Sequence, residues 1–206
     1  MNRSLQGYYA LHSHIYDATR WTFLFGREGI LRRSAEVATP RRILEVGCGT
    51  GRNLRSMQRI FPAADITGVD LSDSMLKIAR RKARGVKLIQ QAYDAPLSGN
   101  FDLVLFSYAL TMFNPGWEDA IRAAKADLNP GGLLAIVDFS HTESNIFRRW
   151  MSINHVRMER HLWPQSRADL EPLVDEIRAA YGGVWHYGMF IGRQNGEHRF
   201  PLATKA

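Results

Sequence analysis

The chain has 206 residues, of which 45% are hydrophobic and 23% charged; this composition is ordinary for a globular protein, and we expect a single domain over residues 1–206. No apolar run reaches the ~20 residues that span a bilayer, no signal peptide is recognisable, and a single cysteine excludes an internal disulfide, so we expect a cytoplasmic protein. The formal net charge of +7 indicates an anionic partner or simply a basic, solvated surface.

Aromatic and apolar side chains recur at helical spacing near the start of the chain, among them Tyr8, Tyr9 and Tyr16. We therefore expect residues 1–40 to form N-terminal helices that cap the binding site of a core made of residues 41–206.

Trp21 and Phe25 stand between Arg20 and Arg27. This pattern suits a membrane-facing segment, because apolar side chains enter the acyl region while arginines meet lipid phosphates. The same aromatic side chains can instead fill the core beneath the N-terminal helix, and the sequence leaves both readings open.

A strand over 42–46 is followed by the turn Gly47-Cys48-Gly49-Thr50-Gly51 and by a helix over 51–60. A second strand over 65–69 leads into Asp70, about 20 positions after the turn. This is the pattern of a nucleotide-binding α/β unit. The glycines let the backbone turn tightly and approach a ligand, and Asp70 can accept both hydroxyls of a ribose.

Strand and helix patterns alternate after residue 40, as in a doubly wound sheet. A helix over 73–83 can be capped by Ser72 or Asp73. Later strands are expected at 86–90, 101–106, 133–137, 184–191 and 197–203. Later helices are expected at 116–127, 143–159 and 167–180.

The pattern Glu45-x-Gly47-x-Gly49-x-Gly51 differs from the dinucleotide spacing Gly-x-Gly-x-x-Gly and resembles the first motif of class I S-adenosylmethionine methyltransferases. The resemblance covers about residues 40–140. It implies an α/β, Rossmann-like fold with a seven-stranded, mostly parallel sheet, helices on both faces and a hairpin of the last two strands. It also implies S-adenosylmethionine as cofactor and S-adenosyl-L-homocysteine as product.

In this family the glycine turn and the following helix start favour the methionine carboxylate, while the acid at the position of Asp70 holds the ribose. Asp94 resembles the acid that accepts from the adenine amino group, although a plain loop acid is an alternative. The cofactor residues that the resemblance implies are Glu45, Gly47, Cys48, Gly49, Gly51, Asp70, Leu71, Met75, Asp94, Ala95 and Ser107.

The stretch from Ile15 to Arg27 resembles the N-terminal part of bacterial BtaB-type enzymes, which methylate diacylglyceryl homoserine to the betaine lipid diacylglyceryl trimethylhomoserine. Related phospholipid N-methyltransferases act on phosphatidylethanolamine. The resemblance implies successive N-methylation of a lipid headgroup by a peripheral protein at the inner face of the cytoplasmic membrane. Its partners would be an anionic membrane surface and an upstream enzyme that supplies diacylglyceryl homoserine.

Tyr16 is the first candidate for orienting amine and sulfonium, because aromatic faces and phenol oxygens favour a cation. Further catalytic candidates are Tyr9, Asp138 and His141, although His141 can also be a plain loop residue. An arginine fork could pair a headgroup carboxylate, or the same arginines could form a solvated basic face. Candidates for contact with substrate or membrane are Tyr8, Arg20, Trp21, Phe25, Arg27, Tyr108, Arg148, Arg149 and Arg157.

Metal catalysis is not expected, because no histidines stand at ligand spacing. A nucleic-acid methyltransferase would suit the charge. However, Ser107-Tyr108-Ala109-Leu110 lacks the Asn/Asp-Pro-Pro-aromatic motif of enzymes that methylate base amines, and no RNA-binding module is recognisable. We therefore expect no nucleic-acid partner. A soluble amine acceptor and a catalytically silent binding protein stay open as alternatives.

Overall fold

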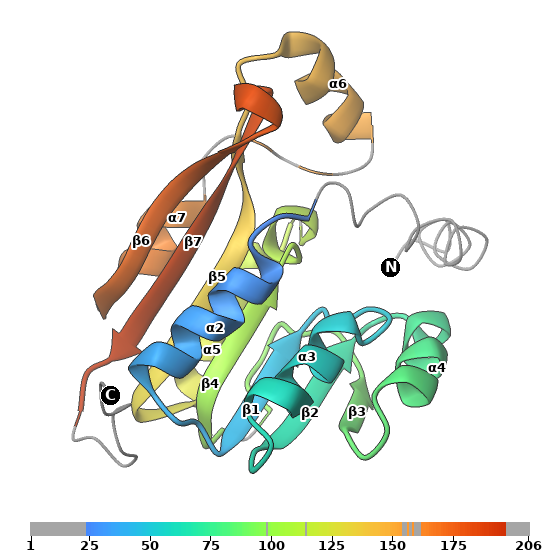
Figure 1. Ribbon diagram of the computed structural model, residues 1–206, viewed down its shortest axis with the longest axis vertical. Coiled ribbons are helices and arrows are strands. Elements are labelled where there is room, and N and C mark those ends of the chain that lie inside the picture. Colours follow the sequence, from blue (N-terminus) through green and yellow to red (C-terminus); the bar gives the residue numbers. More distant parts are fainter. Residues whose placement is uncertain are drawn as a thin grey trace.

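The computed structural model describes residues 24–97, 99–113, 115–153, 156, 158 and 162–196. Its sheet has seven strands in the order β3-β2-β1-β4-β5-β7-β6 (Figure 1). The parallel strands are β1 (Arg42–Val46), β2 (Asp65–Asp70), β3 (Lys87–Gln90), β4 (Phe101–Ser107) and β5 (Leu128–His141). β7 (Trp185–Gln194) runs antiparallel between β5 and β6 (Leu170–Ala180). The predicted Rossmann-like sheet is confirmed.

Helices cover both faces of this sheet (Figure 1). One face carries α2 (Arg27–Val37), α3 (Arg52–Ile60) and α4 (Asp73–Lys82), and the other carries α5 (Trp117–Asp127) and α7 (Leu162–Arg167). α6 (Asn145–Ile153) projects beyond the sheet after the carboxyl end of β5. Two single-turn helices are η1 (Leu110–Met112) and η2 (Tyr181–Gly183). None of the helices in the described residues is both long and apolar enough to cross a bilayer.

The central strands are apolar on both faces, because successive side chains point to opposite sides of a sheet and both sides are covered by helices. Ile43 and Leu103 pack in the cluster beneath α2 and α3, whereas their neighbours Leu44 and Val104 pack in the cluster beneath α5. This burial fixes the carboxyl ends of β1, β2 and β4 along one edge.

The predicted helix over 167–180 is wrong, because residues 170–180 form β6. The alanines, leucine and charged residues of this segment favour a helix locally, but pairing with β7 along its whole length prevails. β6 is an edge strand, and the register shifts between Pro172 and Val174, as is usual for a proline at an edge. The turn Tyr181-Gly182-Gly183, with positive φ at all three residues, joins the two strands.

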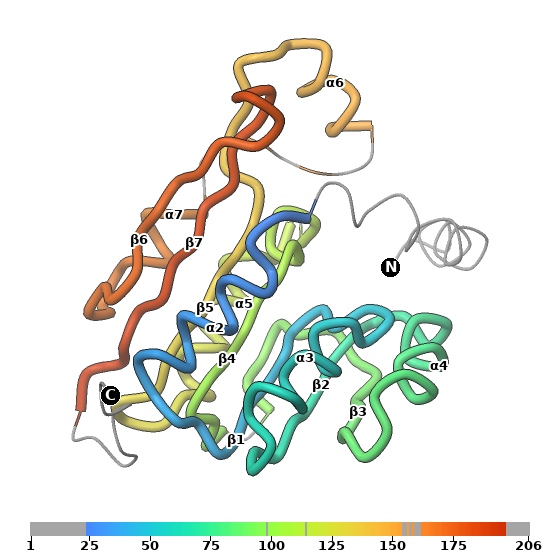
Figure 2. Tube along the Cα trace, in the orientation of Figure 1, coloured from blue at the N-terminus to red at the C-terminus, as the bar shows by residue number. Residues whose placement is uncertain are grey.

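The expected C-terminal hairpin therefore exists, but β6 and β7 form it (Figure 2). The strand expected at 197–203 and the capping helices expected before residue 24 lie outside the described residues. β5 extends to His141, beyond its predicted end, and α6 ends at Ile153 rather than at residue 159.

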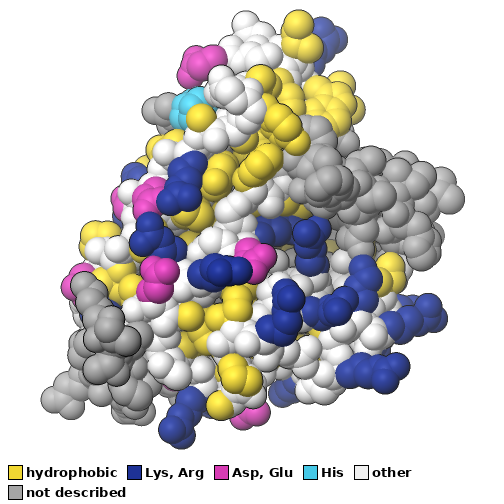
Figure 3. Space-filling view, in the orientation of Figure 1, with side chains coloured by type: hydrophobic (Ala, Val, Ile, Leu, Met, Phe, Trp, Pro, Cys, Tyr) yellow, Lys and Arg dark blue, Asp and Glu magenta, His cyan; other side chains and the backbone are white. Residues whose placement is uncertain are grey.

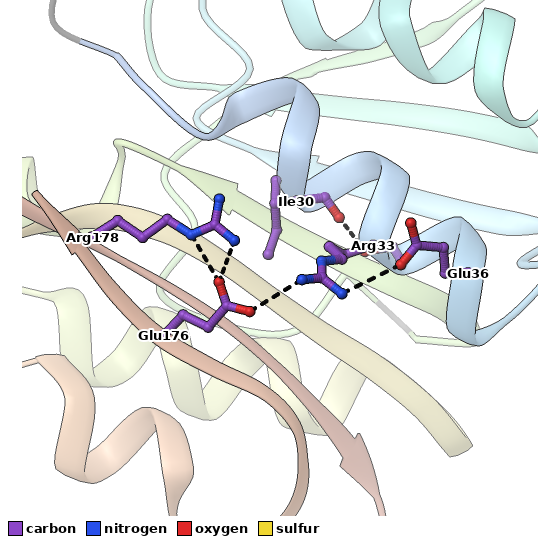
Figure 4. A network of polar contacts seen from close by, with 6 residues as sticks. Ile30, Arg33, Glu36, Glu176 and Arg178 are labelled. Atoms are coloured by element: carbon purple, nitrogen blue, oxygen red, sulfur yellow. Dashed lines mark hydrogen bonds and ion pairs between the residues drawn. The ribbon is translucent and has the colours of Figure 1, made fainter. Parts of the chain in front are cut away.

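An ion-pair network ties α2 to the edge strand (Figure 4). Arg33 lies 3.3 Å from a carboxylate oxygen of Glu176 and 3.6 Å from one of Glu36, and Arg178 donates to Glu176 at 2.8 Å. These partly exposed pairs contribute only about 0–1 kcal/mol each. They nevertheless connect β6 to α2, the helix whose first turn reaches the binding site.

Candidate functional site

A cavity of about 1560 Å³ opens at the carboxyl ends of β1, β2 and β4. β1 lies between β2 and β4, so the chain crosses to opposite sides of β1 at this point. Ligands of open α/β sheets bind at such a reversal of strand order. The wall comes from the loops after these strands, from the loop after β3 and from the first turns of α2, α3 and α4.

The glycine turn after β1 forms the floor of the cavity. Gly47, Gly49 and Gly51 have φ of 69°, 53° and 78°, a region that other residues rarely adopt. A Cβ on Gly47 would lie 2.7 Å from the Cβ of Ala109, whereas one on Gly49 would meet nothing within 4 Å. Gly49 therefore leaves its backbone uncovered by a side chain at the cavity. Gly51 is the N-cap residue of α3 and does not line the cavity wall.

Asp70, at the end of β2, is held by two backbone amides. Gly49 N–H donates to Oδ2 and Ser72 N–H to Oδ1, each at 2.8 Å. Burial raises the pKa of Asp70 above its usual range, and these hydrogen bonds oppose the rise. The carboxylate is thus fixed in orientation at the cavity, where its remaining lone pairs can accept from ligand hydroxyls.

Glu45 and Ser107 place buried polar atoms in the wall. Asn53 donates to Glu45 Oε1 at 2.7 Å. Within the described residues, Glu45 Oε2 and Ser107 Oγ have no hydrogen-bond partner. Burial raises the pKa of Glu45 to about 8. Unsatisfied buried oxygens are costly, so this part of the wall suits a polar ligand.

The loop after β3 is held in place by hydrogen bonds to Asp127, a residue that the sequence did not single out. Asp127, at the end of α5, accepts from the hydroxyl of Tyr93 and from the N–H groups of Leu97 and Gly99. This arrangement leaves Asp94 exposed at the cavity.

Leu71 and Met75 also line the cavity, as predicted for the cofactor site, and Leu71 is 49% exposed. Cys48 is buried beside Gly68, and burial raises the pKa of its thiol far above the usual range, so it packs rather than reacts. Ala95 does not line the wall.

Tyr108 and Arg27 form the side of the cavity toward β5. Tyr108 follows β4 with φ of 56°, and its hydroxyl donates to the carbonyl of Phe25 at 2.8 Å. The guanidinium carbon of Arg27, the first residue of α2, lies 5.8 Å from the centre of the Tyr108 ring. This side of the cavity therefore carries a guanidinium that lies over the buried ring of Tyr108.

Tyr108 is one end of an aromatic cluster that sequence analysis did not recognise as a unit. Its ring centre lies 4.7 Å from that of Phe139, which lies 5.1 Å from Trp185. Phe25 contacts Trp185 at 5.8 Å, so it packs on the cluster and does not line the cavity. Further members are Phe147, Trp150, Tyr181 and Tyr187.

Asp138 and His141 do not reach the cavity. Asp138 is fully buried and accepts from the hydroxyl and the N–H of Thr111, because its side chain points to the sheet face that carries η1. His141 stacks on His186 with ring centres 4.3 Å apart. Neither lines the wall, so the geometry does not support the predicted acceptor-side role of these two residues.

Of the arginines predicted to form a fork, the two that the structure describes, Arg148 and Arg149, do not line the cavity wall. Arg148 donates to the carbonyl of Thr142 and to Asn145, at the start of α6, and Arg149 is exposed on the same helix. Arg27 is the predicted substrate arginine that does line the cavity. Tyr8, Tyr9, Tyr16, Arg20, Trp21 and Arg157 lie outside the described residues.

Among the residues that the structure describes, no group of three or more His, Cys, Asp or Glu is placed to hold a metal ion.

In sequence, the chain is similar to methyltransferases. A family model described as a methyltransferase domain matches residues 18–177. The chain is 31% identical over 188 residues to the biotin biosynthesis bifunctional protein BioCD of Bordetella avium, across 88% of this chain and 37% of that protein. It is 30% identical over 174 residues to a demethylmenaquinone methyltransferase of Tropheryma whipplei, across 81% of this chain and 68% of that enzyme.

Among solved structures, the N-methyltransferase NodS from Bradyrhizobium japonicum, in complex with S-adenosyl-L-homocysteine, matches with a TM-score of 0.67 and 17% identity. The match covers 82% of this chain and 85% of NodS. At this identity the likeness concerns the fold. The chain spans less than two fifths of the length of BioCD, so the relatives do not identify an acceptor for it.

Proposed function

The chain belongs to the S-adenosylmethionine-dependent methyltransferases, and on that premise we propose that it methylates the amine of a lipid headgroup. The preferred acceptor is diacylglyceryl homoserine, taken by successive transfers to diacylglyceryl trimethylhomoserine. An upstream enzyme that makes diacylglyceryl homoserine would supply it. The observation that carries the proposal is the pairing of Tyr108 and Arg27 at one side of the cofactor cavity.

The cavity wall fits the cofactor. Asp70 would accept from the two ribose hydroxyls, and Leu71 would pack on the adenine near Asp94. The open space beside Gly49 lets a ligand approach the backbone, and the positive end of the α3 dipole behind the turn favours the methionine carboxylate. The unsatisfied oxygens of Glu45 and Ser107 suit the polar end of the methionine. When bound, S-adenosylmethionine supplies an electrophilic methyl group.

The acceptor amine would attack that methyl group as a neutral base, the sulfur–methyl bond would break to leave S-adenosyl-L-homocysteine, and the proton of the amine would go to solvent. The protein would orient the amine toward the methyl group and exclude water from the site, and these two effects supply most of the acceleration in such a transfer. The ammonium products grow bulkier and lose hydrogen-bond donors with each methyl group, so an aromatic pocket would retain all of them. Tyr16 and Tyr9 remain proposed orienting groups.

Arg27 favours a homoserine headgroup over ethanolamine. A homoserine headgroup carries a carboxylate beside its amine, and a guanidinium can pair a carboxylate through two parallel hydrogen bonds. The phosphoethanolamine headgroup carries its negative charge on the phosphodiester instead. Phosphatidylethanolamine is therefore the second acceptor to be tested.

The test is expression in a bacterium that makes phosphatidylethanolamine but no betaine lipid, with and without the enzyme that makes diacylglyceryl homoserine. Lipid mass spectrometry should show a trimethylated homoserine lipid only when both enzymes are present. Arg27→Gln should lower its yield at least ten-fold, whereas Arg122→Gln, on the exposed side of α5, should not.

Methylated phosphatidylethanolamine without the partner enzyme would overturn the homoserine assignment. If Arg27→Gln instead weakens binding of S-adenosyl-L-homocysteine, its guanidinium serves the cofactor carboxylate, and the argument for this headgroup fails. No new lipid in either strain would contradict the lipid proposal and favour a soluble amine or RNA.

A further inference from the structure

Exposed apolar side chains gather at one end of the molecule. α6 carries Ile146, Trp150 and Ile153 with 86%, 48% and 71% of their surface exposed. The turn between β6 and β7 adds Tyr181 and Val184, which are also about half exposed. Figure 3 shows hydrophobic side chains at this upper end of the molecule, over α6 and the hairpin turn. The cofactor cavity opens at the same carboxyl edge of the sheet.

The three residues of α6 form one stripe, because positions i, i+4 and i+7 share a helix face. Phe147 and Met151 occupy a different face and pack on the core. α6 thus has two apolar faces, one covered by the protein and one exposed. An exposed apolar stripe of this kind marks an interaction surface.

The charge on α6 indicates what this surface meets. Arg149 borders the stripe, Arg148 lies on the opposite side of the helix, and α6 contains no acidic residue. The nearest acid before it is Glu143, beside His141. Tryptophan and isoleucine beside an exposed arginine suit the interface of an anionic bilayer, where the indole lies at headgroup depth and the guanidinium meets phosphate.

The shape of this end fits a broad, flat partner. α6 projects beyond the sheet (Figure 1). A projecting helix with an exposed apolar stripe can enter a bilayer interface by about 5–10 Å.

We propose that α6 and the turn between β6 and β7 are the surface by which this protein docks on an anionic lipid bilayer. This inference rests on the proposed function, since it places the mouth of the cavity beside the membrane that holds the acceptor. It assigns docking to residues 145–153 and 181–184, in addition to the predicted N-terminal segment.

The experiment measures co-sedimentation of the full chain with phosphatidylglycerol vesicles and with phosphatidylcholine vesicles. The wild type should bind the anionic vesicles, and binding should weaken with salt. The variant Ile146→Ser/Trp150→Ser/Ile153→Ser should lose at least ten-fold in vesicle binding. Ile177→Ser, at an isoleucine of β6 that is 44% exposed, is the control and should bind like the wild type.

Arg149→Glu should also weaken binding to anionic vesicles, with Arg122→Glu as its control. Binding of S-adenosyl-L-homocysteine reports that each variant is folded. A triple variant that binds vesicles like the wild type would overturn the inference, as would a folded wild type that binds neither vesicle but captures a protein through this surface. If vesicle binding depends on α6 but no lipid is methylated, the docking inference is supported and the proposed function is overturned.

Discussion

Two backbone amides fix the carboxylate of Asp70, and this single residue should dominate recognition of the ribose. In Asp70→Asn one carboxylate oxygen becomes an amide donor, so the side chain can no longer accept from Gly49, Ser72 and both hydroxyls. Hydrogen bonds to a charged group contribute about 1.5–3 kcal/mol. We therefore expect titration calorimetry to show binding of S-adenosyl-L-homocysteine weakened by roughly 10–150-fold.

Asp65→Asn, an exposed residue at the start of β2, is the control for Asp70→Asn and should bind like the wild type. Circular dichroism of both variants checks the fold. Affinity within two-fold of wild type in Asp70→Asn would contradict the ribose assignment.

The buried carboxyl of Glu45 predicts a pH-dependent stability. Its pKa is about 8 in the fold and 4.5 ordinarily, so between these values the folded chain holds a proton that the unfolded chain has released. The free energy of unfolding must then fall as pH rises from about 4.5 to about 8, by on the order of a few kcal/mol. Glu45→Gln removes this loss.

Thermal unfolding at pH 5 to 9 checks this expectation in the absence of cofactor. The Tm of the wild type should decrease relative to that of Glu45→Gln as pH rises. The control is Glu118→Gln, at an exposed position on α5. A constant Tm difference between wild type and Glu45→Gln across this range would show that burial does not disfavour the charged form.

Helix α7 packs closely on β7 because residue 188 of that strand is a glycine. A Cβ at Gly188 would overlap the ring of Trp163 on α7, which holds that helix against the strand. Gly188→Ala should therefore destabilise the chain by about 1–3 kcal/mol in urea unfolding. At Gly29, inside α2, an added Cβ would lie 3.8 Å from Sδ of Met189, which is an ordinary contact distance. Gly29→Ala should therefore be neutral or stabilising by up to about 1 kcal/mol. If the two substitutions changed the free energy of unfolding equally, the close contact between Gly188 and Trp163 would not contribute to stability.

The elements of the cofactor half were predictable because their signals are local. The glycine turn, the cap at Ser72 and the strands before Gly47 and Asp70 each depend on a few adjacent residues. β6 was not predictable in this way, because its residues favour a helix locally. It forms a strand because it pairs with β7, which follows the turn at Gly182 and Gly183.

The candidate site divides in the same way. The positions of Gly49 and Asp70 follow from the motif, and the structure brings them into contact. The cluster of Tyr108, Phe139 and Trp185 comes from three distant segments, so no spacing in the sequence reveals it. Asp138 was misplaced because a strand end does not tell which sheet face its side chain takes.

At the scale of the whole molecule, one edge of the sheet combines three surfaces. The cofactor cavity, the wall of Tyr108 and Arg27, and the exposed apolar end at α6 all lie at the carboxyl ends of the strands. This arrangement suits a catalyst that takes its acceptor from a lipid surface. The net charge of +7 favours an anionic one.

The most direct test of this account is methyl transfer by the purified chain from isotope-labelled S-adenosylmethionine into mixed vesicles. The vesicles contain phosphatidylglycerol with either diacylglyceryl homoserine or phosphatidylethanolamine, and mass spectrometry counts the methyl groups gained. The account predicts labelled mono-, di- and trimethylated homoserine lipid. Absence of label from every lipid, with S-adenosyl-L-homocysteine still bound by the chain, would contradict it.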